Sequence, residues 1–152
     1  MIRKFKFEDE MHESLQCVPM AVRRKLDRVG LKIGLENWKA LDRGERLAIC
    51  HIPVDSGEEC DALACFIREA MMRRFGIEPK QLPDAARASA DPPATPPNQL
   101  VAHAGQAGFN LSGAVWTRLD ADERFALMKM GDAAKPSHNL AAALKEFGVP
   151  AS

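Results

Sequence analysis

The feature that most constrains the fold of this chain is a twenty-residue stretch that occurs twice. Residues 30–49 read GLKIGLENWKALDRGERLAI, and residues 108–127 read GFNLSGAVWTRLDADERFAL. At a constant offset of 78 residues and without a gap, seven of the twenty positions are identical. The identical pairs are Gly30/Gly108, Trp38/Trp116, Leu41/Leu119, Asp42/Asp120, Glu45/Glu123, Arg46/Arg124 and Ala48/Ala126. Such self-similarity predicts one supersecondary unit used twice.

The repeated residues are typical of helix ends and helix cores. Gly30 stands where a left-handed residue ends a helix, and Trp38 and Leu41 follow at core spacing. Asp42 and Glu45 form a capping box, in which each side chain accepts from the other residue's backbone N–H. Asp120 and Glu123 repeat that box, and we expect Trp38 and Trp116 to be buried at equivalent places. The repeat therefore predicts helix, short helix and capped helix in each half.

One repeated position is not explained by capping. Arg46 and Arg124 follow the capping glutamate and lie within an apolar stretch. We expect their side chains to extend to the surface or to neutralise a nearby carboxylate such as Asp42 or Asp120. A phosphate- or partner-binding role is the alternative.

Further helix signals complete an all-α prediction. Pro19 opens a helix that runs to about Val29, and a capping box at Ser56 and Glu59 opens one over residues 57–75. A last helix is expected at about residues 137–147. Aromatic residues total 6% and tyrosine is absent, which is sparse for an all-β protein.

Six of the ten prolines lie between residues 79 and 97, and this density favours an extended or disordered linker with one turn near residues 84–89. We therefore expect a single domain over residues 1–152. It consists of a first helical half (1–78), a proline-rich linker (79–98) and a second helical half (99–152). Because two copies are too few for an open solenoid, the halves are expected to pack together with approximate two-fold symmetry.

Charge and hydropathy restrict the partners. Lys plus Arg and Asp plus Glu both number 21, so no overall basic field attracts nucleic acid. No apolar run approaches the ~20 residues of a membrane span, and the first fifteen residues carry charges throughout, unlike a signal peptide. We expect a cytoplasmic protein with no membrane partner. The oligomeric state is not predicted.

The four cysteines, Cys17, Cys50, Cys60 and Cys65, are expected to be reduced. Paired ligands two to four residues apart, which tetrahedral zinc sites use, do not occur. A five-residue offset on a helix also separates Cys60 and Cys65 by about 140° around the axis. Buried structural thiols are the favoured interpretation. A metal or cluster carrier that uses Cys50, Cys60 and Cys65 is an alternative function.

Sequence patterns for catalysis or cofactor binding are missing. The four histidines are scattered, and the chain has no glycine-rich phosphate loop or dinucleotide fingerprint. The local basic cluster is Arg23, Arg24 and Lys25 with Arg28 on the first predicted helix and Lys32 just after it, and the second half does not repeat it. A solvated helix face, an acidic protein partner and a helix-turn-helix DNA reader are the three interpretations of this cluster.

Several blocks resemble the nitrate reductase-associated protein family. They are residues 17–27 (CVPMAVRRKLD), 30–33 (GLKI), 123–127 (ERFAL) and 143–148 (ALKEFG). The resemblance implies a small bacterial accessory protein of nitrate assimilation that helps nitrate reductase to mature or work. It implies no reaction, no cofactor and no catalytic residues. We therefore expect a non-enzymatic protein that binds nitrate reductase or its maturation machinery through Arg23, Arg24, Lys25 and Arg28.

Overall fold

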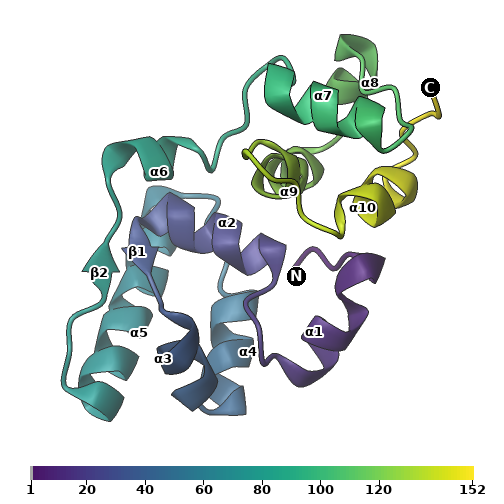
Figure 1. Cartoon of the computed structure of the whole chain (residues 1–152). Coiled ribbons are helices and arrows are strands. Elements are labelled where there is room, and N and C mark those ends of the chain that lie inside the picture. Colours follow the sequence, from purple (N-terminus) through teal and green to yellow (C-terminus); the bar gives the residue numbers. More distant parts are fainter. Residues whose placement is uncertain (1) are drawn as a thin grey trace. The chain divides into compact units, whose positions relative to one another are not determined.

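The structure is a computed structural model that describes residues 2–152, and its chain is mostly helical (Figure 1). Ten α-helices and one pair of two-residue strands form in this described part. The predicted all-α class is confirmed. The strands, β1 (Leu31–Lys32) and β2 (Lys80–Gln81), pair antiparallel, which the sequence did not predict.

The chain divides into two compact units. The first contains the described residues up to Lys4 and the segment Glu8–Ala90, and the second contains Phe5–Phe7 and Asp91–Ser152. The helices of the first unit are α1 (Asp9–Ser14), α2 (Met20–Val29), α3 (Leu35–Ala40), α4 (Arg43–His51), α5 (Gly57–Phe75) and α6 (Asp84–Ala88). Those of the second are α7 (Asn98–Gln106), α8 (Gly113–Arg118), α9 (Ala121–Gly131) and α10 (Leu140–Glu146).

The helix boundaries follow the predicted local chemistry. Pro19 is the N-cap of α2, and Gly30 ends that helix with φ 75°. Complete capping boxes open α4 at Asp42, α5 at Ser56 and α9 at Asp120. The predicted caps are therefore confirmed. Each one satisfies backbone N–H groups that have no partner in the first helical turn.

In the first unit, α2 packs against α4, α5 and α6 around one apolar core (Figure 1). Trp38 is fully buried in this core, and its indole N–H donates to the Leu15 carbonyl oxygen at 2.9 Å. Residues 79–90 belong to the segment expected as a linker, yet they contain β2 and α6, and Ala90 is buried. Proline-rich sequence adopts this order here because β2 pairs with β1 and the Leu82 N–H donates to Gly30.

The core of the second unit lies between α7, α9 and α10, which pack on one another. Trp116 is fully buried, and its indole N–H donates to the Pro93 carbonyl oxygen at 2.8 Å. The N-terminal segment contributes Phe5, which is buried and lies 5.1 Å from the Phe147 ring. Burial of both tryptophans, which the repeat predicted, is confirmed.

The two units use the same local construction at the same sequence offset. When 78 is added to its residue numbers, the start of α2 becomes the start of α7. In the same way, both ends of α3 become the two ends of α8. Both indole N–H groups donate to a carbonyl 23 residues earlier in the chain. These facts support the interpretation of two copies of one unit. That interpretation, and the two-fold packing of the halves, stay predictions.

Candidate functional site

The candidate site is a loosely filled seam between α3 and the C-terminal part of α5, within the first unit. We call it the α3–α5 seam. The α3 side presents Gly34, Asn37 and Ala40, which are three residues apart and therefore share one helix face. All three side chains are small, so they do not fill the space opposite α5. The α5 side presents Met71, Arg73, Arg74 and Phe75, and Ile77, Glu78, Pro79, Lys80 and Lys32 complete the seam.

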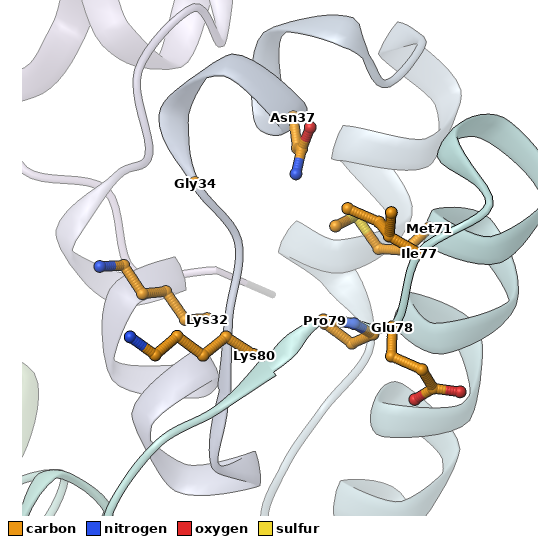
Figure 2. Close-up of a pocket in the computed structure, with 8 residues that line it drawn as sticks. All are labelled: Lys32, Gly34, Asn37, Met71, Ile77, Glu78, Pro79 and Lys80. Atoms are coloured by element: carbon orange, nitrogen blue, oxygen red, sulfur yellow. The ribbon is translucent and has the colours of Figure 1, made fainter.

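Two hollows lie along this seam. One, of about 420 Å³, is lined by Ala40 and the end of α5. The other, of about 260 Å³, is lined by Asn37, Met71 and the two strands, and Figure 2 shows its residues. Ile77 lines the second hollow and is 42% exposed, and Leu35 and Met72, each 48% exposed, are sequence neighbours of seam residues. Exposed apolar groups gathered beside hollows are typical of interaction surfaces.

At the α4 end of the seam, two arginines are held by the capping box of α4. Arg73 contacts Glu45 with 3.0 Å between Nη2 and Oε2, and Arg74 hydrogen-bonds to Glu45 as well. Arg74 Nη2 also lies 2.6 Å from Asp42 Oδ2. This network fixes the end of α5 against α4.

The network also changes the acidity of both carboxyl groups. The hydrogen bond from the Glu45 backbone, followed by the charge of Arg74, lowers the pKa of Asp42. Burial tends to raise the pKa of Glu45, but hydrogen bonds from the Asp42 backbone and from Arg73 and Arg74 outweigh it. The net effect is a lowered pKa. Both groups are therefore stabilised as carboxylates.

At the opposite end of the seam, Lys32 on β1 is the direct cross-strand partner of Lys80 on β2. Both side chains are exposed, and they extend side by side in the same direction (Figure 2). Neither has an ion-pair partner within the described chain. The seam thus has neutralised arginines at one end and a pair of lysines at the other.

The corresponding place in the second unit has larger side chains. At the 78-residue offset, Asn37 corresponds to Val115, which is buried, and Ala40 corresponds to Arg118. The Arg118 Nη2 donates to the Gly148 carbonyl oxygen at 3.1 Å, so this side chain reaches the second residue after α10. The first unit thus has the smaller side chains at these two positions.

The predicted basic cluster on α2 is partly committed to the fold. The Lys25 ammonium donates to the Ile49 and Ile52 carbonyl oxygens at 3.4 and 2.7 Å, and to that of Cys50, at the C-terminal end of α4. The Arg24 Nε donates to the Ala90 carbonyl oxygen at 2.8 Å. Arg28 is half-buried, and Arg23 is exposed. The structure thus gives two of the four cations a structural task.

The repeated arginines also have backbone partners. Arg46 is buried, and its Nη1 donates to the Leu15 carbonyl oxygen at 2.8 Å, the oxygen that Trp38 also uses. Arg124 donates to the Trp116 and Thr117 carbonyl oxygens at 2.9 and 2.8 Å. We expected a carboxylate or the solvent as the partner of these cations. The structure instead places backbone carbonyls there: that of Leu15, which follows α1, for the buried Arg46, and two near the end of α8 for the half-buried Arg124.

The cysteines do not assemble into a ligand set. All four cysteines are free thiols, but the expected burial is right for Cys50 and wrong for Cys17 and Cys65, which are exposed, while Cys60 is half-buried. Burial raises the pKa of Cys50, which disfavours the thiolate that binds metals. Over residues 2–152, no three His, Cys, Asp or Glu side chains gather as a metal site. The geometry thus gives the metal-carrier alternative no support.

The seam could not be predicted from the sequence. Its signal lies in the repeat positions that differ, Asn37 against Val115 and Ala40 against Arg118, rather than in those that match. Those differences acquire a meaning only when α3 and α5 are placed beside each other. Lys80 was likewise hidden in the segment expected as a linker.

Fold and site together define a small all-α protein with an open, partly apolar, cation-flanked surface. The chain belongs to the family of conserved nitrate reductase-associated proteins, whose profile matches residues 4–147. The predicted family is confirmed, and its description connects its members with nitrate reductase. Comparisons with curated proteins and with solved structures gave no match. In the described part of the chain, no helix has the length and apolar character needed to cross a membrane.

Proposed function

We propose that this protein is a cytoplasmic, non-enzymatic accessory protein that binds nitrate reductase, or a protein that helps the reductase to mature, in support of nitrate assimilation. Family membership supports the association. The observation that supports partner binding is the open α3–α5 seam, where the exposed apolar side chain of Ile77 lies next to hollows and cations. Interfaces combine such apolar anchors with a polar rim.

We place the contact surface at the seam, and the α2 cluster is the competing surface. In the α2 cluster, Lys25 and Arg24 hold α4 and Ala90 in place, so replacing them would disturb the fold as well as any binding. Arg23 is exposed and can be changed without that effect. A charge reversal at Arg23 therefore tests the α2 surface cleanly.

The test is the affinity of the purified protein for purified nitrate reductase from the same organism, measured by biolayer interferometry. We expect saturable binding by the wild type, little change in Arg23→Glu and at least a tenfold loss in the seam variant Ile77→Asp. The exposure of Ile77 makes its replacement tolerable for folding, and circular dichroism checks this. Normal binding by Ile77→Asp together with loss in Arg23→Glu would move the contact to α2. Absence of wild-type binding to the reductase and to its maturation proteins would refute the function.

A further inference from the structure

The lysine pair at the β1–β2 end of the seam is unfavourable for the isolated fold. Lys32 and Lys80 are directly opposite in an antiparallel pair, which brings their Cβ atoms to about 4.5–5.5 Å. Like charges in such a pair repel, and a two-stranded ladder this short has little stability to spare. Stability of the fold therefore does not explain why two lysines stand at these positions.

The second unit shows that the fold does not require these charges. Its equivalent of the β1–β2 connection is the Asn110 N–H that donates to the Pro150 carbonyl oxygen at 2.8 Å. The adjoining bond, Ser152 N–H to Gly108 at 3.0 Å, matches the Leu82 N–H to Gly30 at 2.8 Å in the first unit. Uncharged residues thus make the same backbone connection. The two lysines are an addition that is specific to the first unit.

The surroundings of the lysines leave their charge available. The arginines at the other end of the seam are neutralised by Glu45 and Asp42. Glu78, the acidic residue that lines the same hollow, points away from both lysines (Figure 2). The floor of this hollow is apolar on the Met71 and Ile77 side (Figure 2). The stems of Lys32 and Lys80 thus border an apolar hollow, and their ammonium groups extend away from its Met71 and Ile77 side (Figure 2).

We propose that Lys32 and Lys80 form a seat for one acidic side chain of the protein partner, whose apolar neighbour packs against Ile77 and Met71. The carboxylate lies between the two ammonium groups and removes their mutual repulsion. Binding also holds β2 against β1. This inference rests on the proposed function, because it specifies the chemistry of the partner segment at the same seam.

A small probe tests the seat without the partner. The probe is 3-methylbutanoate, which combines a carboxylate with an apolar body, and 3-methylbutanamide is its uncharged match. In ¹H–¹⁵N spectra of the full chain at constant ionic strength, we expect saturable shifts of the Lys32, Gly34 and Lys80 amides with the carboxylate and none with the amide. In Lys32→Gln/Lys80→Gln these shifts disappear, whereas Lys39→Gln, an exposed α3 lysine outside the hollow, keeps them.

Stability and partner affinity separate the possible failures. Because the pair repels, Lys32→Gln/Lys80→Gln is expected to unfold at the wild-type temperature or above it, and to bind purified nitrate reductase at least tenfold more weakly. No saturable probe shift in the wild type, or unchanged shifts in the double variant, would overturn the seat. The seat would also be overturned if the reductase bound the wild type and the double variant with equal affinity. Failure of the reductase to bind the wild type would instead refute the proposed function.

Discussion

At the level of single residues, the Leu15 carbonyl is a shared acceptor in the core of the first unit. Leu15 is buried and has a φ of 52°, and its oxygen accepts from both the Trp38 indole and the Arg46 guanidinium. The positive φ is held by these contacts, since it is a conformation that a leucine rarely adopts. Either donor alone still satisfies the buried oxygen, but the loss of both leaves it without a partner.

This arrangement predicts non-additive stability effects. We expect Trp38→Phe and Arg46→Met each to lower the free energy of unfolding by about 1 kcal/mol, and the double variant to lose about 1–2 kcal/mol more than the sum. The matched pair Trp116→Phe and Arg124→Met should be closer to additive, because those donors use different carbonyls and phenylalanine keeps an aromatic ring for the Arg124 guanidinium, which lies 5.8 Å from the Trp116 ring centroid. Urea unfolding measures all six variants. Additive losses in the first pair would contradict the shared acceptor.

The lowered pKa values of Asp42 and Glu45 predict acid sensitivity. Because both carboxyl groups have a lower pKa folded than unfolded, the unfolded chain binds more protons on acidification. Their stabilising effect is complete above the ordinary values of 3.8 and 4.5 and is lost as the pH falls through the folded values.

We expect Glu45→Gln to weaken this acid dependence, because glutamine keeps the capping bond but has no charge to titrate. Glu59→Gln is the control, since Glu59 caps α5 from the same position by bonding backbone N–H groups. Urea unfolding between pH 3 and 7 gives the dependence. An equal slope in Glu45→Gln and the wild type would show that the arginine network contributes nothing.

Among the elements, those with local signals could be predicted from the sequence. Capping residues and a glycine or proline at the ends defined α2, α4 and α5, because these signals act within one helical turn. The strands carried no such signal. β2 consists of Lys80 and Gln81, and it exists only because residues about fifty positions earlier in the chain pair with it. The seam was equally hidden, since it results from side chains that are small.

The seam can be filled by placing on α3 the larger residues that the second unit has on α8. In Asn37→Val/Ala40→Arg, each new residue is the one that stands at the corresponding position of α8. We expect the Arg side chain to reach the carbonyl of Gly76, the glycine with positive φ that ends α5, since Gly148 is the glycine with positive φ just beyond α10. The free energy of unfolding should stay within about 1 kcal/mol of the wild type, because the positions are partly exposed. A larger loss in urea unfolding would show that the halves are not equivalent here.

For the molecule as a whole, the proposal of a single domain makes a prediction about cooperativity. Each unit contains one of the two tryptophans, so Trp116→Phe leaves a reporter in the first unit and Trp38→Phe leaves one in the second. We expect fluorescence and far-ultraviolet circular dichroism to give coincident unfolding curves in both variants. Separate transitions would mean that the units unfold independently.

We propose that this family member recognises its partner through the α3–α5 seam of its first unit. The most direct measurement is the affinity of purified nitrate reductase for the wild type and for the closed-seam variant Asn37→Val/Ala40→Arg. The account predicts a loss of at least tenfold in the variant, about 1.4 kcal/mol of binding free energy, with stability unchanged. Equal affinities for the open and the closed seam would contradict it.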